Sequence, residues 1–187
     1  MEAHRGRERR GRAQNVLGRM YQSGDGIPRN DQKAVNCFRE AAELGDMNGQ
    51  YNLARMYQQG KKVVRDNKEA AKWFRKAAIQ GHTKALYRLG VLYEKGIGVP
   101  RDPKEADKWK LLAAEQGDAQ AQNYFGVKYA KGLNVEKNYI MAYMWLSLAV
   151  MQGNRMALKN ISTLTDKITH EQIAEAKQMV QAWKPKA

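Results

Sequence analysis

The sequence is poor in the residues that several common classes of protein require. It contains one cysteine, Cys37, which excludes an internal disulfide framework and a cysteine-cluster zinc or iron–sulfur site. It contains no run of about 18 apolar residues, so no segment is expected to span a membrane. Residues 141–151, the most apolar stretch, are short enough to form a buried helix. Hydrophobic residues make up 43% and charged residues 28%, which is ordinary for a globular chain and argues against wholesale disorder.

The chain also lacks the patterns on which most enzymes and metalloproteins depend. Its three histidines, His4, His82 and His170, are far apart in the sequence, so we expect no metal site. The glycines recur as helix stops rather than as a loop that could cradle phosphate, and no serine stands in a nucleophile elbow. We therefore expect no catalytic residue, no cofactor and no enzymatic activity.

Acidic residues are in the minority, with 19 Asp and Glu against 33 Lys and Arg, for a net charge of +14. Half of the excess lies in residues 49–84, where the basic side chains form a cluster. The members of this basic cluster are Lys61, Lys62, Arg65, Lys68, Lys72, Arg75 and Lys76. One interpretation is a surface for an acidic protein, nucleic acid or anionic lipid. The other, which we favour, is a solvated convex face, since the cluster is not interleaved with base-stacking aromatic residues.

A period of 36 residues recurs four times without a gap and organises most of the chain. The repeats are 13–48, 49–84, 85–120 and 121–156, and several columns hardly vary among them. The columns are Leu17/Leu53/Leu89/Phe125, Gly18/Ala54/Gly90/Gly126, Tyr21/Tyr57/Tyr93/Tyr129, Gly24/Gly60/Gly96/Gly132 and Cys37/Trp73/Trp109/Trp145. Leucine and tyrosine four residues apart share one helix face, and the small residue next to the leucine allows a second helix to approach closely. The recurrent tryptophans are expected to pack in the core, and Cys37 to act as a buried small hydrophobe.

Each repeat contains the start and stop signals of two helices. Glycine ends the first helix, Asp66 and Asp102 are placed to cap the second, and His82 stands where the next helix needs an N-cap. A single helix pair cannot bury its apolar face, so neighbouring pairs must stack. The sequence therefore predicts an all-α fold, a right-handed α-solenoid of four helix-pair repeats.

The two ends of the chain do not follow the period. Residues 157–187 predict a C-terminal capping helix pair, whose second helix begins at Thr169 with a Thr169–Gln172 capping box. Residues 1–12 are rich in arginine and glycine, and we expect a disordered basic arm before a repeat domain of residues 13–187. That arm has no apolar secretory segment, so we expect a cytoplasmic protein, or a periplasmic or secreted one if an upstream signal was removed.

The columns resemble the Sel-1-like repeat family, a bacterial type of tetratricopeptide-like repeat. The pattern Ala-x-x-x-Leu-Gly-x-x-Tyr-x-x-Gly, followed by Gly-Val-Pro-x-Asp, Lys-Glu-Ala-x-x-Trp and Ala-Ala-x-x-Gly, is almost complete from Ala85 to Gly117. The sequence departs from it at Cys37, where tryptophan is usual, and at Lys62 and Asn134, where a loop glycine is usual. Asparagine tolerates the left-handed conformation, whereas Lys62 suggests a locally different loop.

The resemblance implies a protein–protein interaction scaffold or adaptor that binds a peptide or protein segment on its concave face. By similarity to the tetratricopeptide relatives, the third, seventh and tenth columns face that groove. The candidate binding residues are Asn15, Arg19, Gln22, Tyr51, Arg55, Gln58, Tyr87, Glu94 and Asn123. A solvated helix face without a partner is the alternative for these residues. For the whole chain the alternative is a basic module that binds nucleic acid or another anionic surface, although nucleic acid is the less favoured partner. A hydrolase, as among the cysteine-rich relatives, is disfavoured because Cys37 has no partner cysteine. The identity of the partner and the oligomeric state stay open.

Overall fold

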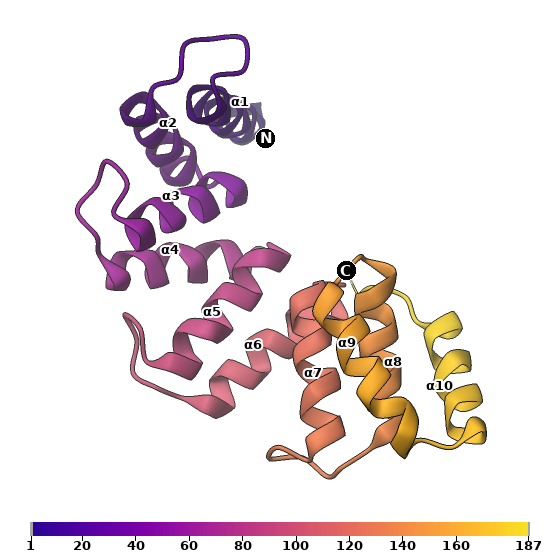
Figure 1. Ribbon diagram of the computed structural model, residues 1–187. Coiled ribbons are helices and arrows are strands. Elements are labelled where there is room, and N and C mark those ends of the chain that lie inside the picture. The colour runs from indigo at the N-terminus through magenta and orange to yellow at the C-terminus, as the bar shows by residue number, and fades with distance from the viewer. Residues whose placement is uncertain (1, 187) are drawn as a thin grey trace. The chain divides into compact units, whose positions relative to one another are not determined.

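The computed structural model describes residues 2–186, and these contain ten α-helices, one 3₁₀ helix and no strand (Figure 1). The helices are α1 (Glu2–Ser23), α2 (Asp31–Glu43), α3 (Met47–Gln59), α4 (Asn67–Ile79), α5 (Thr83–Lys95), α6 (Pro103–Glu115), α7 (Ala119–Lys131), α8 (Tyr139–Met151), α9 (Arg155–Leu164), η1 (Thr165–Lys167) and α10 (His170–Ala182). The helices come in repeating pairs, so the predicted all-α helix-pair fold is confirmed.

The chain forms two compact units, of which the first ends at Ala106 and the second begins at Asp107, within α6. In the first unit each helix from α1 to α5 packs against the next, and α1 also contacts α3. In the second unit α8 packs against α7, α9 and α10. Each unit has an apolar cluster of its own, around Phe38 in the first and Leu146 in the second.

Short polar side chains begin the helices where the sequence predicts them. Asp66 accepts hydrogen bonds from the backbone N–H groups of Lys68 and Glu69 at 2.8 and 3.0 Å, and Asp102 does the same for Lys104 and Glu105. The Thr169–Gln172 capping box at the start of α10 is present in both directions. Each cap satisfies backbone donors that have no partner inside the helix, and such a cap contributes about 1 kcal/mol.

The loop between the two helices of each repeat has two left-handed residues: the glycine that ends the first helix and, two positions later, a residue that is not always glycine. The second of these positions is left-handed whatever its side chain. The backbone φ is 73° at Gly26, 56° at Lys62, 72° at Gly98 and 56° at Asn134. The expectation of a different loop at Lys62 is therefore wrong. The ends of the two flanking helices fix the path of the chain there, and Lys62 adopts the left-handed conformation despite the strain, roughly 1–2 kcal/mol, that a Cβ atom brings.

The expected disordered arm is wrong for residues 2–12, which continue α1 toward the N-terminus; Met1 lies outside the described residues. The side chain of Arg7 donates to the carbonyl oxygen of Glu43 at the end of α2, at 3.0 Å. A Cβ atom on buried Gly11 would lie 3.3 Å from the Cβ of Leu44. The low apolar content of this segment does not lead to disorder, because a close contact at Gly11 and a hydrogen bond from Arg7 hold the helix against its neighbour.

The small residue after the recurrent leucine allows close packing, as predicted. A Cβ atom on Gly18 would lie 2.7 Å from the ring of Phe38, and one on Gly126 would lie 2.5 Å from Cγ of Leu146. Phe38 and Leu146 belong to a column, Phe38/Phe74/Lys110/Leu146, in which every side chain is at most 1% exposed. The neighbouring tryptophan column is less uniform, since Trp145 is buried and Trp73 packs against the edge of its cluster. Cys37 is buried as expected, and burial raises the pKa of its thiol.

The C-terminal segment covers the second unit. Ile168 and Ala176 are buried, and Ile173 packs against the cluster that contains Leu146. Beyond α10 the backbone N–H of Lys186 donates to the carbonyl oxygen of Glu115 at 2.8 Å, and its Nζ pairs with Oε1 of the same residue at 2.7 Å. The apolar contacts cover α8, the second helix of the last repeat, and the bonds to Glu115 attach the end of the chain to the end of α6. This arrangement agrees with the capping helix pair predicted for residues 157–187.

Candidate functional site

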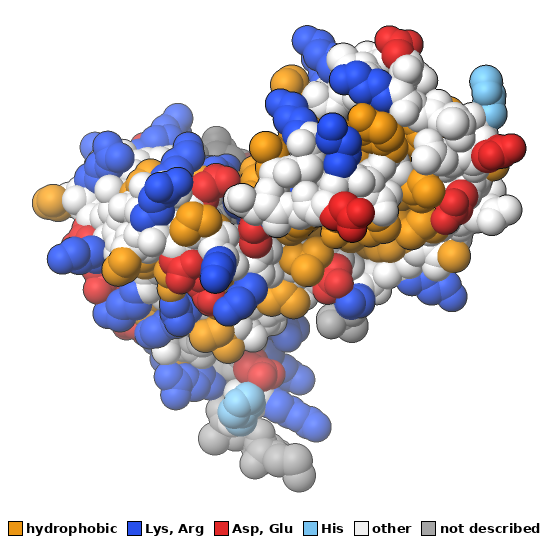
Figure 2. All heavy atoms as spheres, turned by 90° about the horizontal axis from the view of Figure 1, so that it is seen from below, with side chains coloured by type: hydrophobic (Ala, Val, Ile, Leu, Met, Phe, Trp, Pro, Cys, Tyr) orange, Lys and Arg blue, Asp and Glu red, His pale blue; other side chains and the backbone are white. Residues whose placement is uncertain are grey.

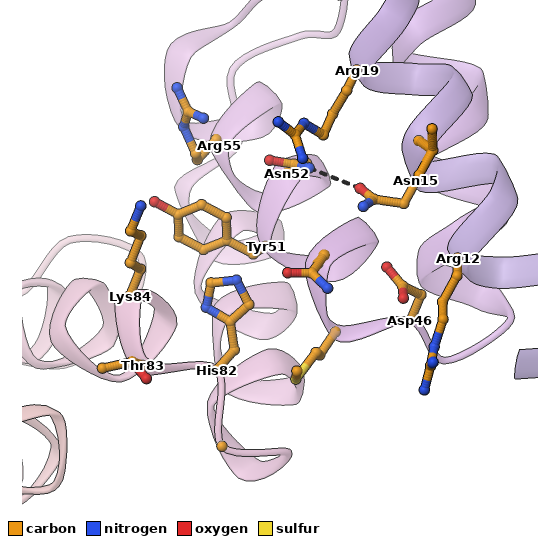
Figure 3. A pocket seen from close by; sticks show the side chains of 14 residues that line it. Arg12, Asn15, Arg19, Asp46, Tyr51, Asn52, Arg55, His82, Thr83 and Lys84 are labelled. Atoms are coloured by element: carbon orange, nitrogen blue, oxygen red, sulfur yellow. Dashed lines mark hydrogen bonds between the residues drawn. The ribbon is translucent and has the colours of Figure 1, made fainter. Parts of the chain in front are cut away.

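The first unit has a pocket of about 800 Å³ on the side where α1, α3 and α5 lie. Side chains from all three helices, and from the turns that precede α3 and α5, line it (Figure 3). We refer to it as the α1–α3–α5 pocket. These are the first helices of three successive repeats, so the pocket is a direct product of the 36-residue period. Its volume lies within the range of about 300–1,000 Å³ that is usual for ligand sites.

Four of the nine predicted binding residues meet in this pocket: Asn15 and Arg19 from α1, and Tyr51 and Arg55 from α3. Gln22 lines an adjoining hollow together with Arg19. The other four do not line the pocket: Gln58, Tyr87, Glu94 and Asn123. Asn123 belongs to the second unit.

Tyr51 is the centre of the pocket wall, and its ring is held on several sides. It stacks on the ring of His82 with centroids 4.4 Å apart and planes 18° apart, and it lies 5.7 Å from the buried ring of Phe74. The Arg55 guanidinium stands 5.9 Å from the centroid of the same ring. Figure 3 shows Tyr51 between Arg55 and His82. Tyr51 is therefore a fixed wall residue, and Arg55 is oriented by it.

An asparagine pair joins neighbouring first helices beside the pocket. Asn52 Nδ2 donates to Asn15 Oδ1 at 2.9 Å, and Asn160 Nδ2 donates to Asn123 Oδ1 at 2.8 Å in the second unit. The same contact thus recurs with the period of the repeat. It gives Asn15 and Asn123 an inter-repeat structural role, which the interpretation of their column as open groove surface missed; Asn15 is only 7% exposed.

The pocket also contains residues that the sequence interpretation missed, above all Arg12, Asn48 and Lys84. These three occupy one column, 36 residues apart, three positions before the column of Asn15 and Tyr51. Residues three apart share a helix face, so the spacing itself could have identified them. Asp46 and His82, which cap α3 and α5, line the pocket as well, because the start of each first helix forms its rim.

His82 combines a capping role with a place in the pocket wall. Its Nδ1 accepts a hydrogen bond from the backbone N–H of Ala85 at 3.2 Å. Burial lowers the pKa of His82 below its ordinary value, and nearby Lys84 lowers it further, whereas Asp46 acts in the opposite direction. The neutral ring is the form that fits this site, since a protonated Nδ1 cannot accept from Ala85.

We expect the stability of the chain to fall as the pH drops below about 6.5, the ordinary histidine value, through the lower pKa of folded His82. Above that pH the ring is neutral in both the folded and the unfolded chain; below it, the unfolded chain binds the proton more readily. The loss should approach the worth of one N-cap, about 1 kcal/mol. His82→Asn keeps a side chain that can cap α5, as Asn154 caps α9. In thermal melts at pH 7 and pH 5, this variant should lose the decrease in stability that protonation of His82 causes. His170→Asn, on the exposed surface of α10, is the matched control; if it has the same effect as His82→Asn, the assignment to His82 is wrong.

The basic cluster of residues 49–84 is partly engaged within the protein. Arg75 donates to the hydroxyl of Tyr93, Lys76 lies 4.1 Å from the ring centroid of Trp73, and Lys72 pairs with Glu69 at 3.0 Å. On the face of the molecule in Figure 2, Lys and Arg stand among acidic and apolar side chains and form no continuous basic surface. These contacts favour the interpretation of the cluster as a solvated outer face.

A buried charged group in the second unit was not anticipated from the sequence. Lys110 is 1% exposed and Lys128 5% exposed. Asp107 pairs with Lys128 and accepts a hydrogen bond from the hydroxyl of Tyr124 at 2.9 Å, and Lys110 Nζ lies 3.7 Å from the centroid of the Tyr124 ring. Lys110 occupies the column of Phe38, Phe74 and Leu146, so its charge replaces an apolar core residue.

No group of three or more His, Cys, Asp and Glu side chains in residues 2–186 is arranged to hold a metal ion. No helix in the same range has the length and apolar character needed to cross a membrane.

The stacked helix pairs and their shared columns define a helical repeat protein. The family model of the Sel1 repeat matches residues 11–46, 48–82, 83–118 and 119–154, and the chain belongs to this family. These matches begin one or two residues before the units deduced from the sequence, close to the first residues of α3, α5 and α7. Sel1 repeat proteins are generally protein–protein interaction modules rather than enzymes.

Solved structures of bacterial Sel1 repeat proteins resemble the chain. A Sel1 repeat protein from Oxalobacter formigenes is 35% identical, with a TM-score of 0.72 over 80% of this chain and 60% of that one. The protective antigen c5321 of uropathogenic Escherichia coli, which displays an SLR fold, is 28% identical, with a TM-score of 0.63 over 92% and 45%. The immunity protein Pa5087 from Pseudomonas aeruginosa is 26% identical, with a TM-score of 0.56 over 92% and 66%. The chain thus spans about half to two thirds of the length of these proteins. The comparison with curated proteins gives no match.

Proposed function

We propose that the chain is a non-enzymatic scaffold that binds a segment of a partner protein in the α1–α3–α5 pocket. The observation that carries the proposal is the convergence of side chains from three successive first helices on one pocket. Repeat proteins bind partners on the extended surface that such stacked helices form. The general role of Sel1 repeats in protein–protein interaction supports the same conclusion.

The chemistry of the pocket suits an extended polypeptide. The hydrogen bond between Asn52 and Asn15 uses the amide nitrogen of Asn52 and the side-chain oxygen of Asn15. The side-chain oxygen of Asn52 and the amide nitrogen of Asn15 can then bind a ligand. Together these offer one acceptor and one donor, which is what a peptide group requires. Arg19 and Arg55 stand beside this pair and supply the side-chain contacts that often dominate binding energy.

The alternative, a basic module for nucleic acid, has weaker support. Its candidate surface is the basic cluster, where Lys72, Arg75 and Lys76 already contact Glu69, Tyr93 and Trp73. Binding to nucleic acid would weaken steeply with salt, so a gel-shift assay at two ionic strengths separates the two functions.

A displayed library of random peptides tests the proposal even though the partner is unidentified. Peptides selected on the wild-type chain should lose binding to the double variant Arg19→Ala/Arg55→Ala. They should keep binding to Arg65→Ala/Lys68→Ala, which removes the same charge from the basic cluster outside the pocket. Tyr51 is left intact because its contacts with Phe74 and His82 make it part of the packing. Equal binding of the selected peptides to wild type and the pocket variant would place the binding surface elsewhere.

A further inference from the structure

The α1–α3–α5 pocket has a strong excess of positive charge. Four cations line it: Arg12 and Arg19 from α1, Arg55 from α3 and Lys84 from α5. The single carboxylate of its lining, Asp46, accepts a hydrogen bond from the backbone N–H of Gly49 at 2.7 Å as the cap of α3. Each of the three first helices therefore presents at least one cation to a shared space.

Within the part of the chain whose side chains the structure describes, acidic partners do not neutralise these four cations. Lys72, Lys128 and Lys186 each form an ion pair within the protein. Among residues 4–186, whose side chains the structure describes, no ion pair joins Arg12, Arg19, Arg55 or Lys84 to Asp or Glu. Like charges that line one pocket repel one another, and a ligand with several carboxylates would relieve that repulsion.

The aromatic groups of the pocket oppose single-stranded nucleic acid as the ligand. Binding of that kind uses open aromatic faces on which bases stack. The pocket's aromatic rings are those of Tyr51 and His82, and they are stacked on each other. Arg55 stands over Tyr51 as well, so the rings are occupied by the protein itself.

We infer that the segment bound in the pocket is acidic, an extended stretch of a partner protein with several Asp or Glu residues. This inference rests on the proposed function and adds the chemistry of the partner. The carboxylates lie against Arg19, Arg55 and Lys84, and the asparagine pair Asn15–Asn52 binds the backbone between them. Planar guanidinium groups suit this role, because they bind carboxylates through two parallel hydrogen bonds.

A pair of labelled peptides tests the inference: a short Glu–Ser repeat and the same peptide with Gln in place of each Glu. Fluorescence anisotropy should show binding of the Glu peptide that weakens as salt is raised, and at least about tenfold weaker binding of the Gln peptide. The double reversal Arg19→Glu/Arg55→Glu should weaken the Glu peptide by about tenfold or more. Arg65→Glu/Lys68→Glu makes the same change of charge in the basic cluster and should stay within about twofold of wild type. Circular dichroism melts confirm that all variants are folded.

The outcomes separate this inference from the proposed function. Equal binding of the Glu and Gln peptides, or equal losses in the two charge-reversal variants, overturns the inference. If library peptides selected on the wild type depend on Arg19 and Arg55 but are not acidic, the proposed function stands and the acidic partner is wrong. If the Glu peptide binds Arg19→Glu/Arg55→Glu as tightly as the wild type, both the inference and the proposed function fail. A single-stranded oligonucleotide that displaces the Glu peptide at lower concentration than unlabelled Glu peptide does would also overturn the inference.

Discussion

Replacing Gly98 by alanine is expected to destabilise the first unit by roughly 2–5 kcal/mol. Two effects combine in this estimate. The backbone φ of 72° brings a strain of roughly 1–2 kcal/mol for any residue with a Cβ atom. The new Cβ would also lie 2.0 Å from the carbonyl oxygen and 2.4 Å from the carbonyl carbon of Asn67, and overpacking of this kind costs roughly 1–3 kcal/mol. Asn67 begins α4, so the clash can be relieved only by moving the loop or the helix.

Gly26 provides the matched control for Gly98. It occupies the same loop position in the first repeat, with a φ of 73°, and its nearest neighbour outside the loop is the flexible Cε of Met20 at 3.6 Å. Gly26→Ala should therefore lose only the conformational part, roughly 1–2 kcal/mol. Urea unfolding followed by circular dichroism measures both variants. Equal losses would show that the close approach of Gly98 to Asn67 has no energetic consequence.

The starts and ends of the helices could be predicted from sequence because their signals are local. Asp66, Asp102 and Thr169 cap the helices as expected, since a capping side chain needs only the backbone two or three residues ahead. The conformation of the loop at Lys62 could not be predicted from the residue type, because the two helices that the loop joins set its geometry. Residues 2–12 were misjudged because a glycine contact with another helix leaves no apolar pattern.

The lining of the α1–α3–α5 pocket could be predicted only in part. Helical spacing placed Asn15, Arg19, Tyr51 and Arg55 on one face, and the structure brings these four together. The same spacing could not tell that Asn15 and Asn123 would bond to asparagines of the next repeat. Those partners lie 37 residues away, and only the stacking of one repeat on another sets their distance.

The buried column Phe38/Phe74/Lys110/Leu146 was overlooked for a related reason. The tryptophan column just before it is more conspicuous in the sequence, and its residues were expected to fill the core. In the structure the residue after the tryptophan points most deeply inward, and Trp73 covers the edge of the cluster. Lys110 broke the apolar pattern of that column, so its burial in the second unit was not foreseen.

Asp107→Asn is expected to destabilise the second unit by about 3 kcal/mol. Asp107 is the acidic partner of Lys128, and Lys110 lies over the ring of Tyr124, the residue that donates to Asp107. Loss of one partner from a buried ion pair costs roughly 3–5 kcal/mol because the other charge stays buried. The lower end applies here, since the side chain of Asp107 is 29% exposed and water screens part of the interaction.

The companion variant Lys128→Met distinguishes this mechanism from a general loss of packing. It removes the more deeply buried charge, whereas the Asp107 that remains can reach water and keeps its hydrogen bond from Tyr124. Lys128→Met should therefore cost less than Asp107→Asn, and the double variant should recover most of the stability lost in Asp107→Asn. Urea unfolding of the four proteins forms a double-mutant cycle. Additive losses, with no recovery in the double variant, would mean that Asp107 does not neutralise Lys128, and that the second unit tolerates its buried lysines by some other means.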